Sequence, residues 1–360
     1  MPGCCRFSRF RIVDRMKIKF FFVMKYIHSC CFSASFLLAC ALVGLLSAGC
    51  SKESLQENGA VIRLGSSAMD VTRAVDSAAD LARIGADVGI YGVPVGASVT
   101  VPADDSQWGN AAIMDNVRTT AIDALSGAVS WSGTYYYPAQ TDHYVEFCAY
   151  HPFAELAAAG SDARFCMEAP VSGKAPRLHF TLSGEEDVMF AGPVVGSRSH
   201  KPQDLVFRHA LTQLRFRLID RYGALSDVTL RSISFPRVNT RSSMNIQSGA
   251  LGEWSFPGAL SLPGVGEVLI SGTEAAPQTV GREIMLQPGL SEFEIEVVTS
   301  RGTYTGVVRP TSSVGSVPET TFAAGRSYLV TLTFQQRTDI SLSASVVPWA
   351  LGGTGSAVIR

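Results

Sequence analysis

Apolar and polar residues alternate at period two along most of the chain after residue 50. The segments 213–218, 291–297 and 340–347 show it plainly, with Arg, acids or Ser at every second position. Such alternation is typical of strands that have one buried face and one wet face. β-branched and aromatic content predicts further strands at 228–235, 267–271, 304–308 and 328–334. The pattern therefore predicts an all-β fold.

Gly and Pro interrupt these strands at short intervals, as they do in β-sandwiches. The paired Pro-Gly dipeptides in 255–264 break strands and make that segment the best candidate for an interdomain linker. We therefore expect a β-sandwich domain over 74–255 and a second one over 256–360, because about 310 residues suffice for two cores. Helical signals are few: 76–84 and 153–159 could each form a turn or two.

The longest apolar run has a different pattern, because it does not alternate. It covers 36–49, follows a basic start, and ends in small residues directly before Cys50. Polar residues come next. This order describes a bacterial lipoprotein signal peptide, so we expect residues 1–49 to be removed and the Cys50 thiol to carry lipid. Acyl chains on Cys50 would anchor the chain to the outer membrane, since each buried methylene contributes about 0.8 kcal/mol.

Three alternatives to this reading stay open. Cleavage at Cys40 would also follow small residues, but it would leave the apolar segment 42–46 in water. A transmembrane anchor is another reading, because 32–49 is at the short end of what spans a bilayer. The true start is also undecided, and the candidates are Met1, Met16 and Met24.

Charge excludes one class of partner. Seven of the 30 basic residues and one of the 31 acids precede Cys50, which leaves 23 basic and 30 acidic residues and a formal net charge of −7. Nucleic-acid binding depends on clustered Lys and Arg, so an acidic mature chain with few Lys argues against it.

Cysteine usage points away from metal chemistry. Only Cys148 and Cys166 follow Cys50. In an oxidising compartment they could form a disulfide, and two free thiols are the equal alternative. There is no CxxC motif and no Cys/His cluster, so we expect no metal and no cofactor.

Other candidate chemistry is weak. His143 and His151 do not have metal-ligand spacing, and His209 reads as a buried structural histidine. The acidic cluster 185–187 reads as a solvated turn rather than a calcium site. Sequence motifs of serine hydrolases, β-lactamases and zinc peptidases are absent. We therefore expect no enzymatic activity.

A series of landmarks in fixed order carries a family resemblance. They are Cys50, 72–74, 88–92, 135–138, the aromatic-Pro element 147–153, the Asp-hydrophobic-Met-aromatic-Ala element 187–191, the Phe-basic-His-Ala-Leu block within 205–216, 322–328 and Trp349. In this order the chain resembles the fimbrillins of Bacteroidota, in particular the minor-fimbrillin-like branch. The resemblance covers about residues 50–350.

The resemblance implies two antiparallel β-sandwich domains of transthyretin-like topology. It also implies a structural or adhesive subunit of surface fimbriae whose partners are other fimbrial subunits. Such proteins are exported as lipoproteins, lose a first strand by cleavage after an Arg, and accept a strand from the next subunit. The resemblance does not separate stalk, anchor and tip.

The residues that suit this mechanism lie at both ends. The short apolar strand in 59–65 follows a polar tether, and Arg73 lies just beyond it in Ser/Thr-rich surroundings, so 50–73 is the segment expected to be removed. Arg63 and Arg83 are the next candidate sites. An ordinary surface arginine is the plain alternative for Arg73. A donor strand would place its apolar side chains in the partner, and the candidates are Ile340, Leu342, Ala344 and Val346. An edge strand of its own domain is the alternative for these four.

A rival function is a surface glycan-binding lipoprotein that does not polymerise. It requires exposed aromatic platforms near Trp131 or Trp254, because sugar rings stack on aromatic side chains. Buried core aromatics are the plainer reading of Trp131 and of 135–137.

Overall fold

The structure is a computed structural model, and in the part of the chain that it describes every named element is a β-strand, twenty in all. It describes residues 59–68, 82, 87–96, 108, 112–157, 163–169, 171, 174–311, 313–314, 317–335 and 340–347. The predicted all-β fold class is confirmed. Within the described residues, no helix has the length and apolar character needed to cross a membrane.

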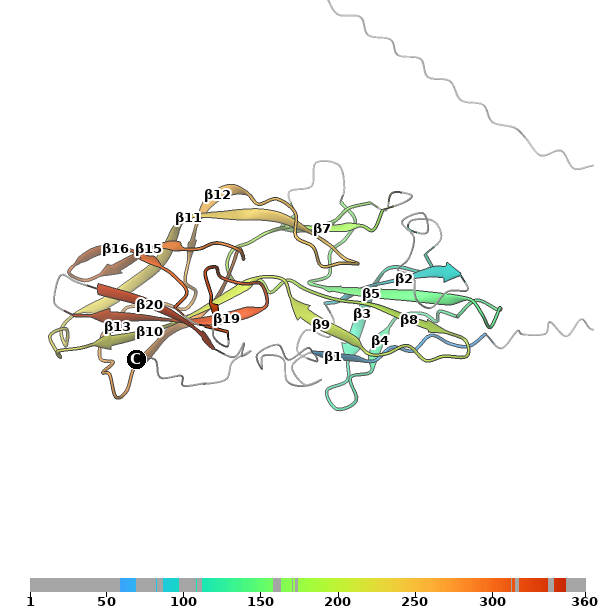
Figure 1. The fold of residues 1–360 in the computed structure, drawn as a ribbon, viewed down its shortest axis with the longest axis horizontal. Helices are drawn as coiled ribbons and strands as arrows, with labels where there is room; N and C mark the ends of the chain where they lie inside the picture. The colour runs from blue at the N-terminus through green and yellow to red at the C-terminus, as the bar shows by residue number, and fades with distance from the viewer. Residues whose placement is uncertain are drawn as a thin grey trace, which may run out of the picture. The chain divides into compact units, whose positions relative to one another are not determined.

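The first sheet has seven strands. Their order is β1 (Ser66–Ala68), β9 (Leu205–His209), β8 (Met189–Ser197), β5 (Tyr144–His151), β2 (Gly89–Gly96), β3 (Met114–Ile122) and β4 (Val129–Trp131). Figure 1 shows β5, β8 and β9 side by side, and β2 lies between β5 and β3.

The remaining strands form three sheets. The second sheet has the order β14 (Gln278–Leu286), β10 (Thr212–Asp220), β19 (Arg326–Phe334) and β20 (Ile340–Val347). The third has the order β16 (Gly302–Val308), β15 (Phe293–Thr299), β11 (Thr229–Asn245), β7 (Arg177–Thr181) and β6 (Phe165–Met167), with β12 (Ser255–Ser261) and β13 (Val268–Leu269) also paired to β11. A short fourth sheet pairs β17 (Ser313–Val314) with β18 (Val317–Pro318).

The second and third sheets pack face to face. Phe216 of β10 contacts Phe235 of β11 with ring centroids 6.1 Å apart, and Phe235 contacts Phe293 of β15 at 6.0 Å. Phe322 then links Phe293 to Tyr328 of β19, with 4.8 Å at each step. This aromatic chain runs from one sheet to the other and back, and all five rings are buried. It forms the centre of the larger core, because aromatic rings bury the most apolar area per residue.

The predicted strands are present, but one prediction for this region is wrong. The expected strand at 340–347 is β20, and the one at 228–235 extends much further as β11. The segment 255–264 is not a linker, because β12 occupies most of it and pairs with β11. Pro257 and Gly258 are tolerated there because β12 pairs with β11 at one edge, and proline is compatible with an edge strand. The division into domains at residue 255 stays a prediction, although strands on both sides of it share a sheet.

Two further expectations need correction. The sheets are not wholly antiparallel, because β1 pairs with β9 and β10 pairs with β19 in parallel. The described part of 153–159 is extended rather than helical, and Leu156 forms a bridge with Met167. The cause is tertiary, since pairing across the chain overrides a weak local helix preference.

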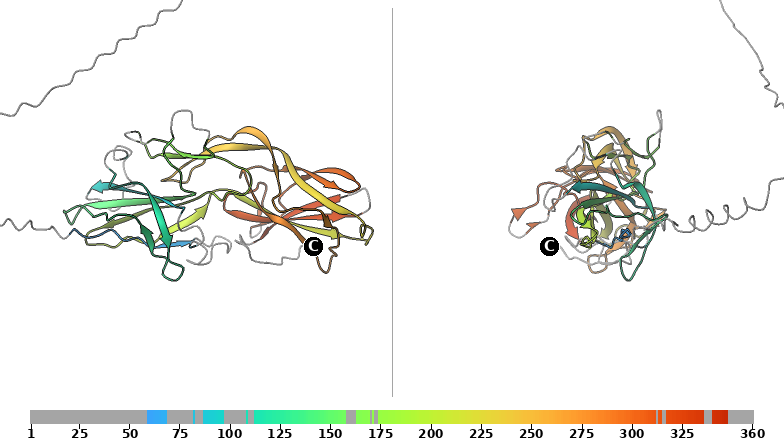
Figure 2. Two further views of the ribbon diagram at one scale, coloured as in Figure 1. Left: turned by 180° about the vertical axis from the view of Figure 1, so that it is seen from behind. Right: turned by 90° about the vertical axis from the view of Figure 1, so that its right-hand side faces the viewer.

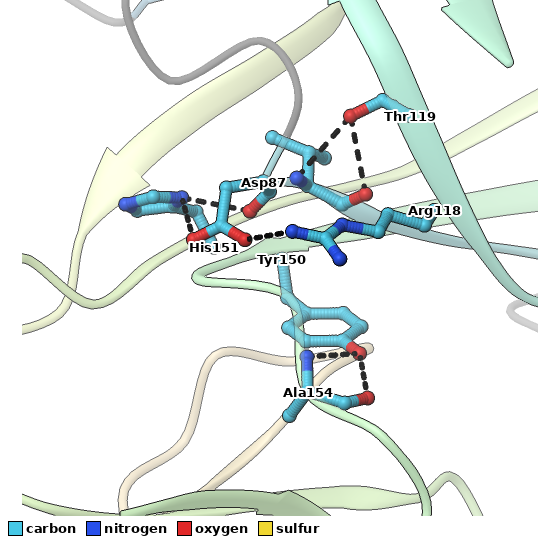
Figure 3. A network of polar contacts seen from close by, with 7 residues as sticks. Asp87, Arg118, Thr119, Tyr150, His151 and Ala154 are labelled. Carbon is cyan, nitrogen blue, oxygen red and sulfur yellow. Dashed lines mark hydrogen bonds and ion pairs between the residues drawn. The ribbon is translucent and has the colours of Figure 1, made fainter.

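Polar contacts fix the start of β2 against β3 and β5 (Figure 3). The Arg118 guanidinium donates to the Asp87 carboxylate at 3.2 Å, and His151 Nδ1 lies 2.9 Å from the Asp87 carbonyl oxygen. The Tyr150 hydroxyl lies 3.1 Å from the carbonyl oxygen of Ala154, whose N–H donates back to it. These contacts hold one end of the first sheet in place.

Candidate functional site

The first described segment of the chain is an extended strand that lies between β9 and the segment 127–137 of the first sheet. We use the name first strand for Gly59–Ala68, which includes β1. Ile62, Leu64 and Ser66 point inward and are buried, while Val61 and Arg63 are exposed. Inward and outward side chains alternate along this segment, which separates an apolar inner face from a wet outer face.

One side of the first strand is bonded to the segment 127–137. Ile62 N–H donates to the Tyr135 carbonyl at 2.9 Å, and Tyr137 N–H donates to the Ala60 carbonyl at 3.0 Å. Further along, Val129 N–H donates to the Leu64 carbonyl at 3.0 Å, and Ser66 N–H donates to the Gly127 carbonyl at 2.8 Å. The Ser66 hydroxyl donates to the same Gly127 oxygen at 2.9 Å. This side therefore carries antiparallel backbone bonds along the strand.

Gly127 permits the close approach of the two chains. Its φ is +69°, which glycine adopts without steric cost. A Cβ at this position would lie 2.2 Å from the Ser66 carbonyl oxygen. A larger residue at position 127 would therefore have to push the first strand away.

The other side of the first strand pairs with β9. Ser66, Ser67 and Ala68 lie opposite Leu205, Val206 and Phe207 in parallel register. Leu205 N–H also donates to the Gly65 carbonyl at 2.9 Å. Figure 2 shows β1 in blue next to the first sheet from behind.

The first strand thus joins the two ends of the first sheet. Apart from the first strand itself, β9 lies at one end of the strand order and β4 at the other, and the first strand bonds to both. Its inward side chains, Ile62 and Leu64, belong to the smaller core together with Ile90, Phe147 and Phe207. Without this strand both ends would have unpaired backbone groups around an apolar slot, which is a template for strand pairing.

The wet side of the first strand borders a basic hollow of about 600 Å³. Its lining includes Arg63, Arg198 and Lys201, against one acid, Asp204. The local excess of positive charge contrasts with the net negative charge of the chain after Cys50. The side chain of Asp204 packs against Gly65, where a Cβ would lie 2.2 Å from Asp204 Oδ1.

The candidate donor strand is β20, an end strand of the second sheet. It pairs antiparallel with β19 over its whole length, from Phe334 opposite Ile340 to Ser327 opposite Val347. Ala344 is buried and Leu342 is half-buried. The side chains of Ile340 and Val346 lie outside the described residues. Thr311 N–H also donates to the Ala344 carbonyl at 2.7 Å.

The remaining processing residues fall outside the described part of the chain. These are Cys50, the candidate lipid site, together with Arg73 and Arg83. Arg63 is described and exposed.

The two cysteines after Cys50 are free thiols in the structure. Cys148 is fully buried in β5, and burial raises the pKa of its thiol well above the ordinary value. Cys166 on β6 is half-buried. The disulfide that the sequence leaves open is therefore not formed here.

The polar residues singled out for metal or acid–base chemistry serve other contacts. His209 Nδ1 lies 2.7 Å from the Asp187 carboxylate, and both side chains are nearly buried. Glu185 pairs with Arg282 at 2.7 Å, and Glu186 pairs with Arg164. Glu185 and Glu186 each pair with an arginine and Asp187 contacts His209, so the cluster serves as turn structure with its own side-chain partners.

The aromatic platforms required by the glycan-binding rival are partly packed away. Trp131 is half-buried against the smaller core, and Trp254 packs on Phe180 with ring centroids 5.7 Å apart. Tyr137 is buried, whereas Tyr136 is half exposed and lies against Gly59 of the first strand. These rings mostly fill core positions.

Comparison with known proteins now decides the family. The fimbrillin-like family model matches residues 72–349, most of the chain. The chain belongs to the fimbrillin-like family. The resemblance read from the sequence landmarks is therefore confirmed, and the family is one of structural fimbrial subunits rather than enzymes.

Solved structures support the fold of this fimbrillin. A fimbrial protein from Bacteroides vulgatus is 15% identical, with a TM-score of 0.56 over 80% of this chain and 99% of that one. A protein assigned to cell adhesion from Bacteroides uniformis is 20% identical, with a TM-score of 0.53 over 81% of this chain and 99% of that one. No match was found among curated proteins.

Sequence reasoning missed the walls of the slot that holds the first strand. The partners are 127–137 and β9, which lie about 60 and 140 residues further along the chain. Gly127 is the one local signal, because a Gly after polar residues marks a turn. Nothing local indicates that this turn would receive the first strand.

Proposed function

We propose that this fimbrillin is a surface fimbrial subunit that polymerises when its first strand is replaced by a strand of the next subunit. One observation carries the proposal: the first strand closes the first sheet and fills its slot with Ile62 and Leu64. A strand bonded to both ends of one sheet can be exchanged as a unit, because main-chain bonds accept any extended segment.

Export as a lipoprotein would precede assembly. The Cys50 lipid would hold the chain at the outer membrane with the first strand in place. Cleavage after Arg73, five residues beyond Ala68, would detach the whole first strand from the fold. The empty slot would then expose apolar side chains and unpaired backbone groups. Loss of this segment is the switch, because the filled slot cannot accept a partner.

The C-terminal strand β20 is the proposed donor. Its alternating Ile340, Leu342, Ala344 and Val346 match the period of the inward residues of the first strand. β20 would have to leave β19 to reach a neighbour, so donation exchanges one strand pairing for another. A contact from the C-terminus of one subunit to the N-terminal slot of the next is head-to-tail and need not close. Repetition of such a contact gives a filament.

A cleavage-site series tests the switch. Arg73→Ala should give full-length lipoprotein that stays monomeric, as judged by intact mass and electron microscopy. Arg63→Ala and Arg83→Ala are the matched single variants and should polymerise normally. Polymer formation by the triple Arg63/Arg73/Arg83→Ala variant would overturn this route.

A peptide covering 340–349 tests the donor. Excess peptide added to cleaved protein should occupy the slot and shorten the filaments. A peptide of the same composition with Leu342 and Ala344 replaced by Asp is the control and should have no effect. Unchanged filament length with the native peptide would exclude β20 as the donor.

A further inference from the structure

The side chain of Phe256, near the start of β12, is exposed, although its position in the strand would place it on the buried face. Asn239 and Arg241 of β11 lie opposite Pro257 and Ser255, so Phe256 faces Thr240. The Thr240 side chain is buried and its hydroxyl donates to the Phe256 carbonyl at 3.0 Å. A regular strand would therefore direct the Phe256 ring to the buried side as well.

The backbone of Phe256 instead sends the ring outward. Its φ is +56°, a left-handed conformation that costs energy for any residue with a Cβ. The side chain is 59% exposed, so the burial that a large aromatic ring normally gains is also lost. Two unfavourable features at one residue call for a function, since strained conformations concentrate at binding sites.

The outward ring stands at a hollow of about 370 Å³ on the wet face of the third sheet. Residues directly opposite on paired strands share a face. Cys166, His179 and Ser243 form one such row across β6, β7 and β11, and Arg241 lies opposite Thr181 in the next. The floor of the hollow is therefore polar, and Phe256 supplies its apolar wall.

Two charged side chains in the hollow have no ionic partner among the described residues. The Arg241 guanidinium lies 4.2 Å from the centre of the Phe256 ring and makes no ion pair there. Glu253 also lines the hollow and is not ion-paired in the described part of the chain. By contrast, Arg164 at the same hollow pairs with Glu186. Arg241 offers hydrogen-bond donors and Glu253 offers acceptors.

We propose that this hollow binds one saccharide unit of a surface glycan. A pyranose has an apolar C–H face that stacks on an aromatic ring and a rim of hydroxyls that both donate and accept. The face of the Phe256 ring that Arg241 does not cover would stack on the apolar face of the sugar, Glu253 would accept from hydroxyls, and Arg241 would donate to them. The volume lies within the range of small-ligand sites. A ligand here would give the proposed fimbrial subunit an adhesive function, so the biological meaning of the site rests on that proposal.

Glycan binding by the monomeric, full-length mature protein tests the proposal. We would screen an array of neutral and acidic oligosaccharides, and then titrate the best binder by calorimetry. Phe256→Ala and Glu253→Gln should each weaken binding by about tenfold or more. Tyr222→Ala is the matched control, because Tyr222 is also an exposed ring beside an arginine, Arg221 at 6.0 Å. It should bind like the wild type.

A second variant guards against misfolding. Phe256→Gly removes the ring and tolerates the positive φ, so its melting temperature should equal or exceed that of the wild type while glycan binding is lost. Three results would overturn the site: no array signal, a signal that Phe256→Ala leaves unchanged, or binding confined to protein ligands.

Failure of this site is distinguishable from failure of the proposed function. Phe256→Ala should polymerise normally after cleavage, because Phe256 lies in the third sheet and the slot in the first. Loss of glycan binding with intact filaments supports the site. Glycan binding by a protein that forms no filaments supports the site and counts against strand exchange.

Discussion

The first strand and β20 have the same kind of sequence but different positions in their sheets. Both place apolar side chains at every second position of one face, Ile62 and Leu64 in the first strand and Leu342 and Ala344 in β20. The first strand bonds to β9 on one side and to the segment 127–137 on the other, whereas β20 pairs along its full length with β19 and also contacts Pro310 and Thr311 at Ala344. The first strand buries Ile62 and Leu64, while the described inward residues of β20 are the smaller Ala344 and the half-buried Leu342.

The difference shows what a replacement strand must supply. Full burial of an Ile or Leu side chain contributes roughly 1.5–3 kcal/mol, so the two inward side chains of the first strand contribute several kcal/mol. A donor must fill the same slot and restore the bonds on both sides. β20 has the required alternation, and its departure leaves β19 paired on one side only, with β10. The slot and the proposed donor therefore differ in how they are held. The slot is closed by the first strand, whereas β20 is the end strand of its sheet.

The largest effect should come from a charge on the buried face of the first strand. Leu64→Asp would place an unpaired carboxylate in the smaller core, which costs roughly 3–5 kcal/mol for a buried uncompensated charge. We expect the first strand to leave its slot. The uncleaved protein should then polymerise or aggregate, as measured by size-exclusion chromatography and electron microscopy.

Val61→Asp is the control on the same strand. Val61 is 43% exposed, so a carboxylate there stays hydrated and stability should change by no more than about 0.5 kcal/mol. Equal behaviour of the two variants would mean that the first strand is not a buried plug.

The second-largest effect should come from a substitution in the segment 127–137, which borders the first strand. Gly127→Ala must move the first strand, because the added Cβ would lie 2.2 Å from the Ser66 carbonyl oxygen. Gly133→Ala has comparable backbone strain, with a φ of +86°, but its nearest new neighbour is Tyr135 at 4.0 Å. We expect Gly133→Ala to cost about 1–2 kcal/mol from strain and Gly127→Ala to cost clearly more.

Hydrogen exchange would localise this difference. In Gly127→Ala the amides of Ile62 and Ser66 should exchange faster, together with their partner Val129. In Gly133→Ala they should not. Unchanged protection of Ser66 in Gly127→Ala would show that the glycine is dispensable for the slot.

Much of the fold followed from the pattern. Alternation located β10, β15 and β20, because a half-buried strand needs period two whatever its partner is. β-branched and aromatic content located β19. The same logic failed at 255–264, where Pro-Gly dipeptides predicted a linker and the chain forms β12. Pairing with the long β11 outweighs the local turn signals there.

Only part of the candidate site could be predicted from the sequence. The apolar segment 59–65 was expected to form a strand, but its partners were not predictable, since pairing across such sequence separations leaves no local trace. The parallel pairing of β1 with β9 was also not predictable from period two, which is the same for both directions. The outward turn of Phe256 leaves no sequence signal, because a left-handed backbone at a large aromatic residue is not a local preference.

The third effect concerns β20. Leu342→Ala should destabilise the free subunit by about 1–2 kcal/mol, less than for a fully buried leucine, because Leu342 is half-buried. If β20 is the donor, the same substitution should also slow polymerisation of cleaved protein. Ser343→Ala, next to it on the strand, is the control and should leave the polymerisation rate unchanged. Destabilisation without a change in polymerisation would make β20 an ordinary end strand.

The smallest expected effect is a difference in the pH dependence of stability between the first and the second sheet. His151 at the end of β5 is buried in the first sheet, and no strand of the second sheet contains a histidine. Burial lowers the pKa of His151 below its ordinary value of 6.5, although the Asp87 carbonyl and the charges of Asp187 and Asp87 oppose this and His209 adds to it. In the unfolded chain His151 titrates near 6.5, so the unfolded state binds more protons just below that pH.

The sign of the pH effect follows from this lowered pKa. The contribution of His151 to stability is complete above about pH 6.5 and is lost as the pH falls through the folded-state pKa. The slope stays below about 1.4 kcal/mol per pH unit, the value for one whole proton. His151→Gln should flatten the stability curve below about pH 6.5. Residue-level hydrogen exchange in the wild type should show acid loosening first in β2 and β5, with β10 and β19 protected. Loosening that begins in the second sheet would assign the acid sensitivity to its carboxylates instead.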